Sequence, residues 1–272
     1  SSNSNLQAYG KNTGGLFANT GVGISGGAPL TNPYVSAHGP SYITAVSPEG
    51  NIKIFSLDPG SVWREKTTVQ GPALYPVHGH QYVQGTNTEY LHVAYLSPEP
   101  SDIMIWSNIH ETVEGASRDT PQGPHMLTSD LYDPSYVSLQ VNMEGGAFLG
   151  FTVTDANQGT KVMVQRLRRD ASHPTHQLDA TSPDVSGPEA FCAHPFVAMH
   201  RGLPLVVYEC GNALEQPIRI IAKQFNSTTP AWPSLRLNTN SPKSLSLVNN
   251  TLLSLLASRN TETSSVELNS SA

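Results

Sequence analysis

The fold is decided by the stretch Asn32-Pro33-Tyr34-Val35-Ser36, which leads through a turn to Tyr42-Ile43-Thr44-Ala45-Val46 and then to Ile52-Lys53-Ile54-Phe55. Short apolar runs separated by Gly, Pro and Ser predict three consecutive β-strands. The middle run is apolar at nearly every position, which indicates a strand that is packed on both faces.

The same order of runs recurs along the chain. Measured at the middle strand, the copies begin near Tyr42, Tyr90, Ala147, Pro204 and Leu252, at intervals of 48, 57, 57 and 48 residues. Intervals of this length are typical of four-stranded propeller blades. We therefore predict an all-β protein with a single β-propeller domain over residues 1–272. Five blades fit the count best, and six would require one degenerate blade.

The two ends of the chain extend the repeat. Leu16-Phe17 and Val22-Gly23-Ile24 resemble the outer part of a blade, whereas an outer strand is missing after Val266-Glu267-Leu268. Pairing the N-terminal and C-terminal segments would close the ring and cover both sheet edges. A β-sandwich also contains many short strands and is the alternative, although a sandwich does not require the repeat.

The composition narrows the classes of function. Charged residues make up 13% of the chain, the formal net charge is −6, and there are 22 Gly and 21 Pro. This composition excludes a coiled coil or helical bundle. Without a basic stripe we expect no nucleic-acid partner, and without an apolar run of about 18 residues we expect no membrane insertion. Low charge with abundant Ser, Thr, Asn and Gly favours a secreted protein.

Cys192 and Cys210 flank one predicted hairpin, whose turn is Arg201-Gly202. Their residue numbers are centred on position 201, so the two cysteines should face each other across the hairpin. We predict a disulfide, with two buried free thiols as the alternative. Three N-glycosylation sequons begin at Asn226, Asn249 and Asn269, which is the number expected by chance.

The repeat of Pro-x-Val, a Gly turn and two apolar strands resembles that of bacterial and fungal secreted propellers. Five-bladed glycoside hydrolases among them carry acids where the inner strands begin. Here those positions hold Asn32, Asp133 and His194, each before a proline, and a neutral amide cannot act as a general base. Gly187-Pro188-Glu189-Ala190 resembles the segment that supplies their general acid. The resemblance implies Asp133 and Glu189 as catalytic candidates if a further acid, such as Asp130 or Asp184, replaces the missing one.

Two further groups of residues are candidates for ligand binding. Alternate positions on a strand place His78 and His80 on one face, which makes them weak candidates for a metal site with no assignable third ligand. Trp63, Trp106 and Trp232 occur at or after third strands, where an indole can stack on a sugar ring. The alternative for these rings is packing between blades.

These observations lead to one preferred function and two alternatives. We expect a secreted, lectin-like propeller that binds glycans or glycoconjugates and needs no cofactor. The first alternative is a glycoside hydrolase or polysaccharide lyase with a central acidic site. The second is a structural component of an extracellular or viral assembly.

Overall fold

The structure of the chain is a computed structural model. The structure describes residues 7–11, 17–23, 29–35, 42–58, 62–98, 101–113, 115–126, 133–142, 146–154, 159–168, 177–178, 185–187, 191–200, 202–211 and 219–225.

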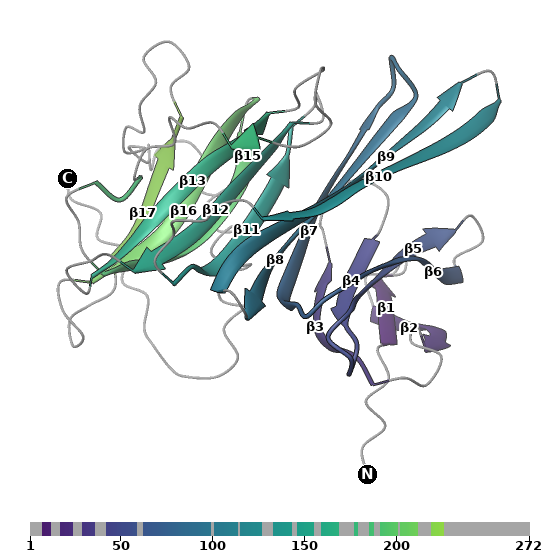
Figure 1. Cartoon of the computed structure of the whole chain (residues 1–272), viewed down its shortest axis with the longest axis horizontal. Coiled ribbons are helices and arrows are strands. Elements are labelled where there is room, and N and C mark those ends of the chain that lie inside the picture. Colours follow the sequence, from purple (N-terminus) through teal and green to yellow (C-terminus); the bar gives the residue numbers. More distant parts are fainter. Residues whose placement is uncertain are drawn as a thin grey trace. The chain divides into compact units, whose positions relative to one another are not determined.

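The regular elements among these residues are β-strands, and in every sheet the neighbours are consecutive strands (Figure 1). The first four-stranded sheet consists of β3 (Thr31–Val35), β4 (Tyr42–Val46), β5 (Ile52–Asp58) and β6 (Val62–Val69). The second consists of β7 (Leu74–Val83), β8 (Thr88–Pro98), β9 (Ser101–Val113) and β10 (Ala116–Met126).

The third four-stranded sheet consists of β11 (Ser135–Val141), β12 (Ala147–Thr154), β13 (Thr160–Arg168) and β14 (Gln177–Leu178). The fourth sheet consists of β15 (Cys192–His200), β16 (Leu203–Cys210) and β17 (Arg219–Gln224). Near the N-terminus, β1 (Gln7–Lys11) pairs with β2 (Phe17–Gly23).

This strand order is that of propeller blades. A sandwich with Greek-key connections would exchange strands between sheets, whereas the described sheets keep the order of the chain. The strand order of the described sheets confirms the predicted all-β propeller fold. The number of blades and the pairing of the chain ends stay predictions, and the last predicted copy, near Leu252, lies outside the described residues.

The chain divides into two compact units. The first contains Ser1–Leu131, Leu139–Ala147 and Leu167–Gln177, and the second contains Tyr132–Ser138, Phe148–Arg166 and Leu178–Ala272. The predicted single domain over residues 1–272 stays a prediction. No helix in the described part of the chain has the length and apolar character needed to cross a membrane.

Each unit has an apolar core between its strands. In the first unit the core is formed by residues of β4 to β9, namely Tyr42, Ile52, Ile54, Val69, Ala73, Leu91, Val93, Tyr95 and Trp106. In the second unit it is formed by Phe148, Val162, Val164, Val185, Cys192, Val197, Val206, Tyr208 and Cys210. The middle strands β4, β8, β12 and β16 are the most deeply buried, as their continuous apolar runs predict.

One irregularity recurs where the inner strands begin. In the first sheet Thr31 pairs with Val46 but Tyr34 pairs with Thr44, so the inner strand has one extra residue, which is a β-bulge. The same one-residue shift occurs in β7 between Leu74 and Val77, and in β15 between Ala193 and Phe196. The three bulges contain Asn32-Pro33, Tyr75-Pro76 and His194-Pro195.

At the inner-strand starts that the structure describes, the residue before the proline has a positive φ. The values are 49° for Asn32, 50° for Tyr75, 45° for Asp133 and 54° for His194. The sequence predicted three of these equivalent positions. Tyr75-Pro76 is a fourth, and it begins β7, an inner strand that the looser second copy of the repeat did not reveal.

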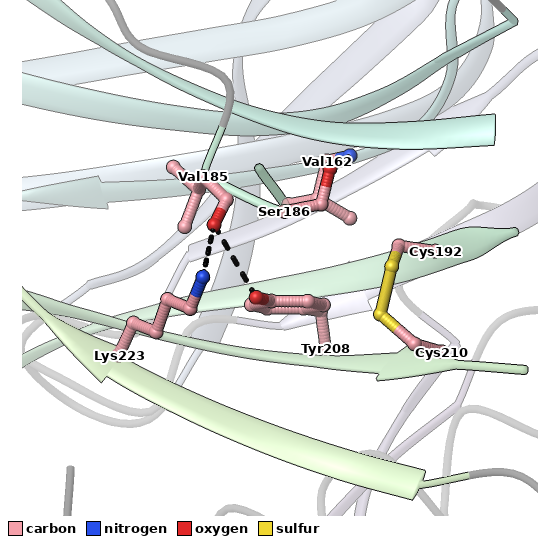
Figure 2. Close-up of a disulfide and its surroundings, with 7 residues drawn as sticks. All are labelled: Val162, Val185, Ser186, Cys192, Tyr208, Cys210 and Lys223. Atoms are coloured by element: carbon pink, nitrogen blue, oxygen red, sulfur yellow. Dashed lines mark hydrogen bonds between the residues drawn. A yellow bond between two sulfur atoms is a disulfide. The ribbon is translucent and has the colours of Figure 1, made fainter. Parts of the chain in front are cut away.

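The predicted disulfide between Cys192 and Cys210 is present (Figure 2). The two residues pair directly across the β15–β16 ladder, with their Cα atoms 4.1 Å apart. Beside them, the backbone carbonyl of Val185 accepts hydrogen bonds from Nζ of Lys223 at 2.6 Å and from the hydroxyl of Tyr208 at 3.3 Å. These bonds tie a loop residue to β16 and β17.

Candidate functional site

The bulge of β15 differs from its counterparts in the residue that faces it. In the first two sheets the residue before the bulge pairs with an apolar partner, Val46 or Leu96. In the β15–β16 sheet the equivalent partner is Glu209, opposite Ala193. A carboxylate therefore stands where the two structurally equivalent positions of the first unit have aliphatic side chains. Such a departure from a repeated scaffold marks a candidate functional residue.

Glu209 and His194 form a close pair. Oε1 of Glu209 contacts Nδ1 of His194 across the bulge, and the two side chains are 13% and 27% exposed. The pair is thus half-buried and still reachable from solvent. A half-buried imidazole and carboxylate in contact are groups that can move a proton or hold a sugar hydroxyl.

Tyr136 of β11 completes the cluster. Its ring lies edge-on to the ring of His194, with 3.8 Å between the ring centroids, and the residue is 52% exposed. Strands β11 and β15 are joined here, because the backbone N–H of Val197 donates to Oγ of Ser138 at 3.0 Å. We call His194, Glu209 and Tyr136 the bulge cluster.

Asp133 lies beside this cluster in the chain. It is exposed, has a positive φ, and comes three residues before Tyr136 at the start of the inner strand. The structure therefore places Asp133 and His194 at equivalent inner-strand starts, as predicted. Glu189, the other catalytic candidate, lies outside the described residues, as do Asp130 and Asp184.

The bulge at His194-Pro195 packs closely against strand β12. Gly150 of β12 lies against it, and a Cβ at this glycine would stand 2.6 Å from Cγ2 of Val197 and 3.4 Å from Cβ of Pro195. The disulfide partner Cys192 lies two residues before His194, and Cys210 directly follows Glu209. Both residues of the half-buried pair are therefore next to a covalent cross-link.

The first unit contains a second polar cluster, which includes the predicted metal candidates. His78 and His80 are 1% and 3% exposed, and Tyr42 contacts both rings, so the two histidines share one face of β7 as predicted. Nδ1 of His78 lies 3.2 Å from Oγ1 of Thr44. Burial, with the nearby charge of His80, lowers the pKa of His78 to about 3. Among the described residues, no three His, Cys, Asp or Glu side chains are grouped as metal ligands.

Glu89 of β8 is the centre of this second cluster. Its Oε1 accepts a hydrogen bond from the hydroxyl of Tyr42 and lies 3.6 Å from Nζ of Lys66. Nε2 of His80 lies 3.0 Å away, within ion-pair distance but without the alignment of a hydrogen bond. Burial opposes ionisation of Glu89, but these contacts outweigh it and lower its pKa to about 2. Burial, together with Glu89, raises the pKa of Tyr42.

The contacts of Glu89 join two sheets. Tyr42 and Lys66 belong to β4 and β6, while His80 and Glu89 belong to β7 and β8. With a neutral phenol and a carboxylate that is ionised at neutral pH, these side chains, which we call the Glu89 cluster, link two sheets within the first unit.

The tryptophans occupy packing positions where they are described. Trp106 is 6% exposed and belongs to the core of the first unit, and Trp63 packs against Ile43 and Phe55. Packing between strands, the alternative to sugar binding, accounts for the positions of Trp63 and Trp106. Trp232 lies outside the described residues. Tyr136, whose ring contacts that of His194, is an aromatic member of the bulge cluster that the sequence did not single out.

Sequence reasoning also missed Glu209. One signal was available: Glu209 directly follows the apolar run Leu205-Val206-Val207-Tyr208 and directly precedes a cysteine. The contact between Tyr136 and His194 had no such signal, since the two residues belong to different sheets.

No family model matches the sequence, and no curated protein matches it. Solved structures similar to this chain include three enzymes. The sialidase of Trypanosoma rangeli in complex with the inhibitor DANA has 11% identity and a TM-score of 0.48 over 85% of this chain and 41% of its own. The endo-arabinase of Bacteroides thetaiotaomicron has 14% identity and a TM-score of 0.46 over 78% of this chain and 81% of its own.

An exo-1,5-α-L-arabinanase from a bovine ruminal metagenomic library has 11% identity and a TM-score of 0.43 over 78% of this chain and 75% of its own. This chain spans less than half the length of the sialidase. The resemblance to glycoside-hydrolase-like propellers noted in the sequence is thus also found among solved structures. A shared fold does not imply a shared activity.

Proposed function

We propose that this chain is an extracellular, carbohydrate-active propeller protein that cleaves glycosidic bonds at the bulge cluster. The observation that carries this proposal is the contact between Glu209 and His194, with the exposed ring of Tyr136 against the imidazole. A carboxylate, an imidazole and an exposed aromatic ring are the groups with which proteins hold a sugar, through its hydroxyls and its C–H face.

Hydrolysis of a glycosidic bond requires two carboxyl groups in most enzymes of this kind. Glu209 would supply one, oriented by His194. Asp133, exposed at the neighbouring inner-strand start, would supply the other. In this proposal one group protonates the leaving oxygen, and the other activates water or attacks the anomeric carbon. The disulfide next to Glu209 fits an oxidising, extracellular compartment.

A second candidate function is glycan binding without cleavage. It is favoured by the exposure of Tyr136, 52%, since a stacking ring with one hydrogen-bonding carboxylate suffices for a lectin-like site. This reading needs no second carboxyl group and thus no role for Asp133.

The experiment is a reducing-sugar release assay on arabinan, xylan, xyloglucan and sialyllactose, with affinity electrophoresis on the same glycans. For a hydrolase, Glu209→Gln and Asp133→Asn should each lower kcat at least a hundredfold and leave binding within about threefold, because the charge acts in the transition state. Glu65→Gln is the matched control. Glu65 is an exposed carboxylate of the outer strand β6 that pairs with Lys53 of β5.

The two candidate functions predict different results. Binding without release, lost in Tyr136→Ala and retained in Asp133→Asn, would support the lectin-like function. Release that persists in both carboxylate variants would contradict the proposed site.

A further inference from the structure

Tyr75 has a backbone conformation that its side chain does not favour. Its φ is 50°, in the left-handed region, and it is followed by Pro76. Asn, Asp and His are comparatively frequent in this region because of their short polar side chains, but a bulky aromatic residue there is an outlier. Proline adds strain, since it disfavours helical backbone in the residue before it.

The bulge accounts for the positive φ of Tyr75, but the contacts of its side chain do not account for a tyrosine at this position. The residue is 60% exposed, and its neighbour Leu74 is 40% exposed. Among the described residues, no hydrogen bond or ring contact of the Tyr75 side chain is found. The bulge requires a positive φ at this position, which glycine or asparagine would satisfy at lower cost. The phenol ring therefore does not serve the fold of β7.

The same conformation recurs at two exposed aromatic residues of the second unit. Tyr136 has a φ of 51° and Phe191 a φ of 56°, and they are 52% and 40% exposed. Tyr75 occupies in β7 the position that His194 occupies in β15, directly before the bulge proline. Backbone strain at residues that do not help folding is typical of binding positions.

We propose that Tyr75 is a glycan-binding residue of the first unit, whose ring stacks on the apolar face of a sugar. The inference rests on the proposed function for the class of its ligand. The bulge fixes the backbone from which the ring projects, and the exposed face of the ring is open to a ligand. Stacking of this kind contributes affinity without requiring a charged partner.

The test exploits the positive φ. Tyr75→Gly removes the ring and introduces the residue that the backbone prefers, so the melting temperature should not fall. Retardation of this variant by affinity electrophoresis in arabinan, xylan or xyloglucan gels should weaken about tenfold relative to the parent chain. Tyr75→Phe, which keeps the ring, should retain binding.

The matched control is Asn87→Gly. Asn87 has the same φ of 50° but lies in the turn at the other end of β7, where its Oδ1 accepts an exposed hydrogen bond from the hydroxyl of Tyr82 at 3.1 Å. Its replacement should therefore leave binding unchanged and lower the melting temperature only slightly. Equal retardation of Tyr75→Gly and the parent chain would overturn the inference, as would a parent chain that none of these gels retards. A marked fall in the melting temperature of Tyr75→Gly would also overturn it, because the ring would then be a packing residue. Sugar release by Tyr75→Gly tests the proposed function separately.

Discussion

Cys192 lies directly opposite Cys210 because the bulge at His194-Pro195 shifts the β15–β16 ladder by one residue. Between the bulge and the turn, Phe196 pairs with Val207 and paired residue numbers add up to 403. Continued without the bulge, this register would place Cys192 opposite Gly211. The irregularity that gives His194 its positive φ thus also aligns the disulfide, and cross-link and site are parts of one local structure.

The disulfide should be the largest single contribution to the stability of the β15–β16 hairpin. Titration of the denatured, unreduced protein should find no free thiol. Replacing both cysteines with alanine should lower the free energy of unfolding by about 3 kcal/mol, since the cross-link closes a short loop with a sequence separation of 18. Two titratable thiols in the parent protein would contradict the disulfide.

The Glu89 cluster should make the stability of the first unit sensitive to acid. The pKa of Glu89 is lowered to about 2, so its contribution to stability is fully present above about pH 4.5 and is lost as the pH falls toward 2. Glu89→Gln should lower the free energy of unfolding at pH 7 by on the order of 2 kcal/mol. Denaturant unfolding followed by tryptophan fluorescence measures this, with Glu65→Gln as an exposed control. Equal stability of the two variants would show that the Glu89 cluster contributes nothing to the free energy of unfolding.

His78 should add a second acid-sensitive contribution at higher pH. Its folded-state pKa is lowered to about 3, whereas the unfolded chain binds a proton near pH 6.5. The unfolded state therefore holds more protons in this window, and folded stability decreases as the pH falls from 6.5. Between pH 7 and 5 the parent protein should lose about 2 kcal/mol more than His78→Asn. Parallel pH profiles for the two proteins would refute a buried, neutral His78.

Gly150 should be intolerant of any side chain. A Cβ there would stand 2.6 Å from Cγ2 of Val197, a stiff β-branched side chain next to the bulge. Gly150→Ala should therefore destabilise the second unit by about 1–3 kcal/mol and displace the segment Pro195–Val197 that follows His194. Gly85→Ala, at a glycine with open space around it, is the control. Thermal unfolding of both variants compares the two positions, and a harmless Gly150→Ala would refute the close packing.

The sequence predicted those parts of the fold that depend on local pattern. The apolar run Tyr42–Val46 coincides with β4, and the cysteine spacing led to the disulfide. Strand β10 (Ala116–Met126) was missed because it is a mostly exposed outer strand that includes Pro121 and Pro124. Such a strand has no apolar alternation, and its pairing with β9 alone defines it.

The candidate site was predicted only in part, for a related physical reason. Asp133 and His194 could be found because each precedes a proline at a repeated position. Tyr75 was missed at the equivalent position, as its copy of the repeat is looser. Tyr136 reaches His194 through a contact between sheets, which no sequence spacing encodes. Glu209 belongs to the same hairpin as the cysteines, so the spacing that predicted the disulfide also placed it opposite Ala193, next to His194.

The location of the glycan site is tested most directly by nuclear magnetic resonance of the protein with ¹⁵N-labelled histidine, titrated with the glycan it binds most tightly in the electrophoresis assay. The ten histidines serve as reporters along the chain. We predict that the imidazole signals of His194 shift on titration, while those of His78, His80 and His92, buried in the first unit, stay unchanged. Shifts confined to these three histidines, with His194 unaffected, would contradict a glycan site at the bulge cluster.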